Sequence, residues 1–311
     1  MILQVHLITN CTNNKRSYLN NKISFGDILN KEVPDIQDWV KATTNNQSRD
    51  LAINTYAGDH WKVARDLHSK GIPLWVLSAG FGFISSQDEI CSYDATFSTG
   101  GTNSVSRFAS TTDSLSDNIT WWNQLHANRN CKYRYDLTSM VKKHKQDFFC
   151  ISASPQYLKV ILPELLALVE DEFLTTENTI IISSQVELPQ ILKPLHILAT
   201  EDFCELLQGS RVSLNIRLAR YLIEKIDAGD EFSKQVKDEY QKLKQASKPA
   251  KKFDRQKMSD GEVSNYINRK LNSSPDKASA TTLLATFRNE GFACEQKRFG
   301  KIFKQTQESC K

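Results

Sequence analysis

Tyr93 and Asp94 place an aromatic ring and a carboxylate side by side, shortly after a turn made of small residues. The turn, 78–82 (Ser-Ala-Gly-Phe-Gly), follows the continuous apolar run 74–77, which predicts a strand buried on both faces. Its two glycines let the backbone turn sharply and let a ligand approach closely. Open α/β sheets place their sites at such strand ends, although the segment also fits a tight turn with Phe81 in the core.

A second group of polar residues comes just before a predicted helix that runs to residue 226. It contains a glycine, two serines, an arginine and an asparagine, at Gly209, Ser210, Arg211, Ser213 and Asn215. Free N–H groups, hydroxyls and a guanidinium at a helix start can converge on one phosphate. An ordinary helix cap with an exposed arginine is the alternative interpretation.

A third group is the loop that leaves the first predicted strand, 2–8. The loop runs from Thr9 to Arg16 and is dense in hydrogen-bonding side chains, including Asn10 and Cys11, and it ends in the cations Lys15 and Arg16. A polar loop after a buried first strand often lines a ligand site, and an Asn-rich turn is the other interpretation.

The elements that must position these groups alternate along the chain. Strands are predicted at 2–8, 74–77, 147–153, 179–182 and 195–199, and helices at 50–70, 118–126, 137–145, 154–169 and 214–226. This alternation is typical of an α/β domain with a mostly parallel sheet and flanking helices.

The C-terminal part has a different composition. The lysine-rich segment 246–258 predicts a basic linker, and 259–311 predicts a compact helical unit with helices from about 259, at 279–289 and at 294–304. The last helix carries Lys297 and Arg298, which fits a helix-turn-helix-like module that binds nucleic acid, although small protein-interaction domains share this pattern. The domains are therefore predicted at 1–245 and 259–311, joined by 246–258.

Composition narrows the class of protein. The 311-residue chain has a net charge of +4 and an isoelectric point near 8.5, which permits a nucleic-acid partner without requiring one. Its seven cysteines are widely spaced without a C-x-x-C pair, so we expect reduced thiols, no metal site and no cofactor. No apolar run is as long as a membrane span and no leader pattern is visible, so we expect a cytoplasmic protein without a membrane partner.

Residues 1–100 resemble a known superfamily. The marks are the loop from Thr9 to Lys15, the pair Tyr56 and Gly58, the strand and turn 77–84, and the YDATF element at 93–97. These are similar to the uracil-DNA-glycosylase-like superfamily, which includes the YaaA-like peroxide-stress proteins and a domain of the archaeosine-processing enzymes. The resemblance implies an α/β fold of that type with a nucleobase pocket at the strand ends. The chain lacks the Gly-Gln-Asp-Pro-Tyr and His-Pro-Ser motifs of true uracil-DNA glycosylases, so their catalytic residues cannot be transferred.

Catalytic roles are therefore assigned from chemistry. Cleavage of an N-glycosidic bond passes through an oxocarbenium-like transition state, which a nearby carboxylate stabilises or for which it orients water. Asp94 is the first candidate because it lies beside the central turn, and Asp59 and Asp88 are weaker candidates. Asn10 would act with Asp94 by reading the edge of a flipped base.

The remaining assignments follow from what a flipped base requires. Rings on which it stacks would come from Phe81, Tyr93 and Tyr56, and Ser78 would bind a base oxygen or water. Lys15 and Arg16 would hold phosphate. Cys11 is interpreted as a small packing residue of the pocket, because no histidine is placed to activate it.

The sequence thus predicts a DNA glycosylase that removes a modified base, flipped out of double-stranded DNA, and leaves an abasic site. Action on hypermodified phage DNA would make it an antiviral defence protein. Two alternatives remain open, a non-catalytic DNA-binding stress or defence protein and a base-exchanging transglycosylase.

Overall fold

The computed structural model describes residues 4–16, 21–29, 35–109, 111–128, 133, 135–226, 231–250, 254–273 and 279–309. Two residues of the first predicted strand, Cys131, Cys310 and part of the predicted linker (251–253) lie outside these ranges. The chain forms two compact units, Met1–Ala250 and Lys251–Lys311, and each is described by itself.

A six-stranded sheet with the order β10-β9-β8-β1-β4-β5 is the centre of the first unit. Neighbouring strands run parallel except β5, which pairs antiparallel with β4. The strands are β1 (Val5–Asn10), β4 (Leu74–Ser78), β5 (Gly82–Ser85), β8 (Phe148–Ser152), β9 (Thr179–Ser183) and β10 (His196–Leu198). The predicted α/β class with a mostly parallel sheet is confirmed at this level.

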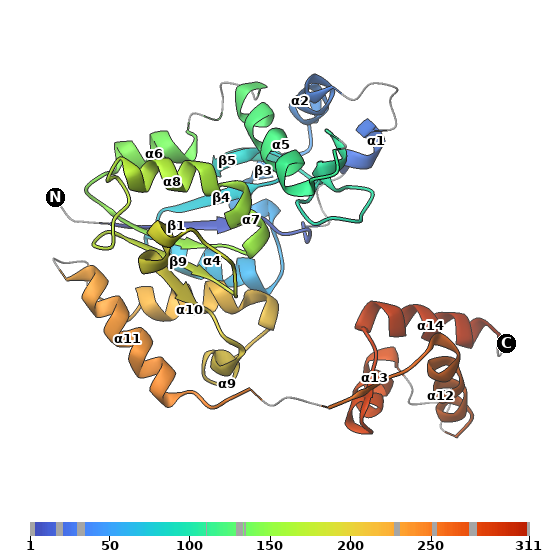
Figure 1. Cartoon of the computed structure of the whole chain (residues 1–311). Coiled ribbons are helices and arrows are strands. Elements are labelled where there is room, and N and C mark those ends of the chain that lie inside the picture. Colours follow the sequence, from blue (N-terminus) through green and yellow to red (C-terminus); the bar gives the residue numbers. More distant parts are fainter. Residues whose placement is uncertain are drawn as a thin grey trace. The chain divides into compact units, whose positions relative to one another are not determined.

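Helices cover both faces of the sheet, which explains the continuous apolar runs of its central strands. All residues of β4, β8 and β9 are buried. As Figure 1 shows, α4 and α10 lie on one face, and α5 to α8 lie on the other. These helices are α4 (Asp59–Ser69), α5 (Ser114–Asn128), α6 (Leu137–Lys143), α7 (Pro155–Val160), α8 (Leu162–Glu170) and α10 (Leu214–Ile223).

The direction in which strands are added reverses next to β1. The chain first places β4 and β5 on one side of β1, and then β8, β9 and β10 on the other side. The carboxyl ends of β1 and β8 therefore flank a topological switch point, where open α/β sheets leave a crevice for ligands.

Two sequence predictions differ from the structure. The predicted helix 50–70 begins instead as β3 (Arg49–Leu51), which pairs with β6 (Glu89–Cys91), and continues as the short α3 (Ala52–Thr55) before α4. Gly58, with φ of 94°, separates α3 from α4. β5 was not predicted, because its Gly-Phe start reads as a continuation of the turn.

Smaller elements complete the first unit. They are β2 (Ile23–Ser24), α1 (Phe25–Leu29), α2 (Ile36–Asn45), β7 (Tyr93–Asp94), α9 (Cys204–Leu207), α11 (Phe232–Ala246), and the 3₁₀ helices η1 (Val105–Arg107), η2 (Gln190–Leu195), η3 (Glu201–Phe203) and η4 (Arg211–Ser213). The five described cysteines are free thiols: Cys11, Cys91, Cys150, Cys204 and Cys294.

The second unit has a hydrophobic core of its own. Its elements are β11 (Gln256–Lys257), α12 (Asp260–Ser273), α13 (Ala280–Asn289), β12 (Phe292–Ala293) and α14 (Gln296–Ser309), and β11 pairs parallel with β12. The core is built around Phe287, Phe299 and Ile267, which are fully buried. The three helices overlap the three predicted from sequence. Across the described residues of both units, no helix is long and apolar enough to cross a membrane.

Candidate functional site

A pocket of about 530 Å³ opens at the carboxyl ends of β1 and β8. Residue types that form hydrogen bonds dominate its walls. It is lined by Asn10, Cys11, Thr12, Asn13, Asn14, Ala57, Gly58, Asp59, His60, Thr96, Ser98, Ser154, Tyr157, Ser210, Val212, Ser213 and Asn215. The volume is in the range of small-molecule sites, and the position is the switch point of the sheet. We take this pocket as the candidate site.

Two amide side chains are fixed at the floor of the pocket. Asn10, at the end of β1, accepts a hydrogen bond from the Ser154 backbone N–H (2.9 Å) and donates one to the Cys11 carbonyl (2.9 Å). Asn215, in the first turn of α10, donates to the Ala153 carbonyl (3.0 Å). Each amide uses one of its N–H bonds for the fold, so each retains a second N–H for a ligand.

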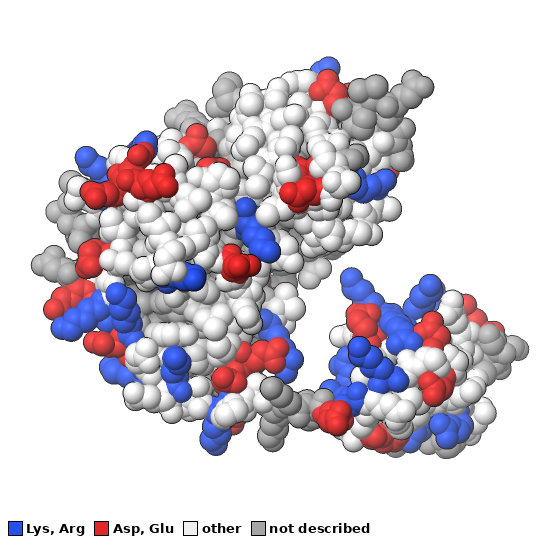
Figure 2. Space-filling view, viewed as in Figure 1, with Lys and Arg blue, Asp and Glu red and all other residues white. Residues whose placement is uncertain are grey.

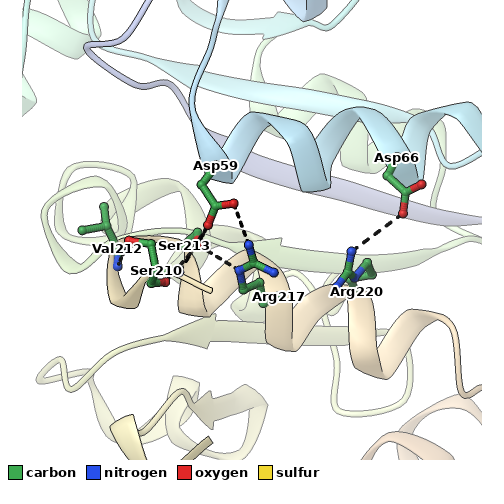
Figure 3. A network of polar contacts seen from close by, with 7 residues as sticks. All are labelled: Asp59, Asp66, Ser210, Val212, Ser213, Arg217 and Arg220. Atoms are coloured by element: carbon green, nitrogen blue, oxygen red, sulfur yellow. Dashed lines mark hydrogen bonds and ion pairs between the residues drawn. The ribbon is translucent and has the colours of Figure 1, made fainter. Parts of the chain in front are cut away.

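Asp59 is the carboxylate of the pocket (Figure 3). Its Oδ1 accepts a hydrogen bond from Arg217 Nη2 at 2.6 Å, and its Oδ2 accepts a short one from the Ser213 hydroxyl and a long one (3.4 Å) from the Ser210 backbone N–H. Hydrogen bonds from Arg217 and Ser213 lower the pKa of Asp59 to about 2. The side chain is 38% exposed, so an ionised carboxylate that is paired with Arg217 borders the pocket at neutral pH.

Gly209 controls where Arg217 lies. Its φ is 115°, and a Cβ at this position would stand 2.2 Å from the Arg217 Cζ. A residue with a side chain would therefore be strained and would displace the guanidinium. The glycine predicted to contact phosphate thus makes room for an arginine.

His60 presents a fixed tautomer. The Thr9 hydroxyl donates to the Ser152 carbonyl (2.7 Å), so it must accept its second hydrogen bond, of 2.8 Å, from His60 Nε2. Nε2 therefore carries the proton and Nδ1 holds a lone pair. Burial lowers the pKa of His60 to about 4, so the ring is neutral at physiological pH.

The residues expected to stack on a base form a closed network instead. Ser78 Oγ accepts hydrogen bonds from the Tyr56 hydroxyl (3.2 Å) and the Phe81 backbone N–H (3.1 Å), and the Tyr93 hydroxyl lies 2.7 Å from Ser78 Oγ and 2.9 Å from the Tyr56 hydroxyl. Each of the three hydroxyl protons thus has an acceptor inside the triangle. All of these side chains are buried, and none of them lines the pocket. Gly80 is required here, since a Cβ would come within 2.6 Å of the Tyr93 ring.

Cys11 lines the pocket, whereas Lys15 lies beside the closed network. The Cys11 sulfur lies 3.0 Å from the Tyr157 hydroxyl, and both residues line the pocket. Lys15 points inward: its Nζ donates to the Thr12 carbonyl (3.0 Å) and lies 3.9 Å from the centre of the Tyr93 ring. Burial lowers the pKa of Lys15 to about 8. Lys15 thus lies against the Tyr93 ring, and its role in holding phosphate stays a prediction.

Asp94 is not among the residues that line the pocket. It is on β7, where its Oδ2 accepts a hydrogen bond from Lys22 Nζ at 2.7 Å. Arg16 is exposed, and its backbone N–H donates to the Thr55 carbonyl. The predicted pair is thus divided, with Asn10 on the pocket floor and Asp94 outside the lining.

The other predicted DNA contacts are also distributed differently. Of the 209–215 group, Ser210, Ser213 and Asn215 line the pocket, whereas Arg211 pairs with Glu201 (3.1 Å). In the second unit, Arg298 is held by Asp260 (2.5 Å), and Lys297 is exposed on α14.

One cluster of possible metal ligands occurs among the described residues, at His6, His144 and Asp147. It lies at the other end of β1, because His6 is the second residue of that strand. Trp75 Nε1 donates to His6 Nδ1 (3.1 Å), so His6 Nε2 carries the proton and donates to Asp147 (3.0 Å). If a metal ion bound Nε2, the ring proton would have to be on Nδ1, where it would face the N–H of Trp75 instead of a hydrogen-bond acceptor. The arrangement fits a hydrogen-bonded group better than a metal site.

Sequence reasoning ranked Asp59 below Asp94 and did not single out Arg217 or treat His60 as a site residue. Asp59 and Arg217 are 158 positions apart, so no local pattern joins them. The available signal was the Gly-Asp-His start of the helix that precedes β4, since the start of a helix that leads into a parallel strand lies at the carboxyl ends of the strands.

Comparisons with known proteins give no further guide. No protein-family model matches the chain, and neither a curated protein nor a solved structure matches it significantly.

Proposed function

We propose that this protein is a DNA glycosylase that hydrolyses the N-glycosidic bond of a modified base at the switch-point pocket and leaves an abasic site. The observation that carries the proposal is Asp59, an ionised carboxylate fixed at a polar pocket large enough for a nucleoside. The resemblance of residues 1–100 to the uracil-DNA-glycosylase-like superfamily supports it, and membership of that superfamily is part of the proposal.

The chemistry assigns one role to Asp59. As the C1′–N bond breaks, its electron pair leaves with the base and the sugar becomes oxocarbenium-like, so a nearby negative charge stabilises the transition state. A water molecule then adds its oxygen to C1′, and its proton goes to the departing base or to solvent. Because the pKa of Asp59 is about 2, the residue acts through its charge and is too weak a base to take that proton.

Base recognition falls to the two amides and to His60. Asn10 and Asn215 offer N–H donors, and the lone pair on His60 Nδ1 is an acceptor, so the pocket is suited to a base edge that contains both kinds of group. Val212, an apolar side chain at the rim, is 89% exposed and can contact a neighbouring base.

The second unit supplies a surface for the polyanion. Lys297, Lys301 and Lys304 are spaced by four and three positions on α14, so they lie along one face of the helix, and all three are exposed. Figure 2 shows Lys and Arg side chains gathered on the visible face of this unit, with acidic side chains among them. We propose that these lysines contact the phosphate backbone, with affinity that falls steeply as salt is raised.

Base release tests the proposal. Purified protein is incubated with phage genomic DNAs that are plain or carry modified pyrimidines or purines. Free bases are identified by mass spectrometry and abasic sites by alkaline cleavage. We expect release from at least one modified genome and its loss in Asp59→Asn; a protein that binds DNA but releases nothing from any genome contradicts it. Protection of cells against phages with that modification would extend the proposal to antiviral defence.

A non-catalytic DNA reader is the second candidate, and one observation favours it. Both oxygens of Asp59 already accept hydrogen bonds, from Arg217 and Ser213, as in a purely structural ion pair. If the protein is a reader, Asp59→Asn still binds DNA and there is no turnover to lose. If it is a glycosylase, the same variant still binds DNA but stops base release.

A further inference from the structure

Three donors converge on the Asp59 carboxylate at the edge of the pocket (Figure 3). They are Arg217 Nη2, the Ser213 hydroxyl and the Ser210 backbone N–H, and Arg217 Nε also donates to Ser213 Oγ (3.0 Å). We call these donors the anion cradle. A guanidinium, a hydroxyl and a backbone N–H aimed at one anion are the groups with which proteins hold phosphate oxygens.

The cradle has donor capacity that Asp59 does not use. Arg217 is 13% exposed, and within the described ranges its hydrogen bonds come from Nε and Nη2, not from Nη1. A guanidinium carries five N–H donors in a planar fork, so Nη1 keeps both of its hydrogens for a second acceptor. The backbone is shaped for this arginine, because Gly209 leaves the space that the guanidinium fills.

Asp59 is held by polar contacts that an incoming phosphate can replace. Its side chain is 38% exposed, and it begins α4 on the face of the pocket. On the same two helices, Asp66 lies 4.0 Å from Arg220, more than a turn away from the pocket (Figure 3). Because α4 and α10 also pack against each other away from Asp59, loss of the Asp59 contact need not separate the helices.

We propose that the anion cradle is a phosphate-binding site, which Asp59 fills when no ligand is bound and which a phosphate of the substrate takes over. The exchange frees the Asp59 carboxylate from Arg217 and Ser213 while leaving it at the pocket. This inference rests on the proposed function for the identity of the substrate, a nucleic-acid strand, but the cradle itself is defined by its contacts. In this scheme a backbone phosphate of the substrate releases Asp59 from Arg217 and Ser213. The negative charge of Asp59 then acts on the sugar of the same strand.

Phosphate binding by the full-length protein tests the cradle directly. Inorganic phosphate and the dinucleotide pTpT are titrated into wild type, Asp59→Asn and the matched control Asp66→Asn by calorimetry, with unphosphorylated thymidine as the ligand without phosphate. Each substitution removes one negative charge from α4. We expect Asp59→Asn to bind both phosphate ligands roughly tenfold tighter than wild type, as for removal of one competing charged hydrogen bond, and Asp66→Asn to change little. Equal affinity in the two variants overturns the proposal.

A second change guards against an indirect effect. Adding Arg217→Gln to Asp59→Asn should abolish the gain, and retention of the gain would place phosphate elsewhere and overturn the assignment. If Asp59→Asn does not fold, Asp59→Ala serves in the same comparison. A gain for inorganic phosphate but not for pTpT identifies free phosphate as the ligand and removes the link to a strand. Because these titrations need no base release, they succeed or fail independently of the glycosylase assay.

Discussion

The closed network of Tyr56, Ser78 and Tyr93 and the anion cradle around Asp59 are two hydrogen-bonded groups near the same end of the sheet, and they differ in completeness. Inside the closed network every hydroxyl proton has an internal acceptor, and the side chains are buried. In the cradle the charged groups are partly exposed and Arg217 retains unused donors. A completed network stabilises the fold, whereas an incomplete one at a pocket can accept a ligand.

The comparison shows why residue type alone does not identify the residues of a pocket. Tyr93 and Asp94 are the most suggestive neighbours in the sequence, yet Tyr93 belongs to the closed network and Asp94 pairs with Lys22. Asp59 looks like an ordinary first-turn carboxylate until the fold brings Arg217 to it. The cradle differs from the closed network in two ways: its side chains are partly exposed, and its arginine has N–H donors left for a ligand.

The largest effect should separate the two carboxylates. If Asp59 stabilises the transition state, Asp59→Asn lowers the rate of base release by on the order of 100- to 1,000-fold, as for other losses of transition-state electrostatics. Asp94→Asn should lower it by less than about threefold. Single-turnover rates with a substrate from the base-release screen measure both, and the opposite order of effects would return the catalytic role to Asp94.

Opening the closed network should instead reduce stability. Ser78→Ala removes the acceptor of Tyr56 and the partner of Tyr93, which leaves buried hydroxyls unsatisfied at a cost of about 1–3 kcal/mol. Ser98→Ala, at an exposed position of the pocket, is the matched control and should change the free energy of unfolding by less than about 0.5 kcal/mol. Urea unfolding gives both values, and equal values would show that the network contributes nothing.

Acid should weaken the cradle in a defined range. The pKa of Asp59 is lowered to about 2 in the folded protein, so its contribution is complete above the ordinary value of 3.8 and is lost as pH falls from there towards 2. With the side chain 38% exposed, screening limits this contribution to about 1 kcal/mol. The difference in unfolding free energy between wild type and Asp59→Asn should shrink from pH 5 to pH 2.5; a constant difference would mean that Asp59 gains nothing from its charge.

A further prediction concerns Lys15, whose ammonium lies beside the Tyr93 ring of the closed network. Its pKa of about 8 lies below the ordinary value of 10.5 because burial disfavours the ammonium form. The stability of wild type relative to Lys15→Met should therefore rise with pH between about 8 and 10.5, since the unfolded chain binds the extra proton there. Carbon-13 shifts of the lysine Cε measure the titration. Lys70, whose pKa is raised by Glu224 and Asp66, should titrate at a higher pH than Lys15 in the same experiment.

Much of the fold follows from local pattern, and much of the site does not. The apolar runs of β4, β8 and β9 identify strands because both of their faces are covered, and Ser154-Pro155 correctly begins α7. β3 was read as helix because three residues show no usable period. Asn10 and Asn215 were singled out from strand-end and helix-start positions, and the structure brings both to the pocket.

The contacts that define the site were beyond such reasoning. Arg217 is one of the polar residues of an amphipathic helix, and nothing in that helix marks it as a site residue. Its partner, Asp59, comes 158 positions earlier in the chain. The tautomer of His60 depends on Thr9 and Ser152, which come from two strands that are adjacent only after the switch in strand order. Neither contact can be predicted from the spacing of residues within one segment.

The two edges of the central sheet have a consequence for how copies of this protein behave at high concentration. The edge strands are β5, with four residues, and β10, with three. Edge strands expose backbone groups onto which another chain can add as a further strand, and shortness limits that route to aggregation. The longer strands, which would make better templates, lie inside the sheet with both neighbours in place. The strand order of the central sheet therefore disfavours self-association by addition of a further strand, independently of the side chains at the surface.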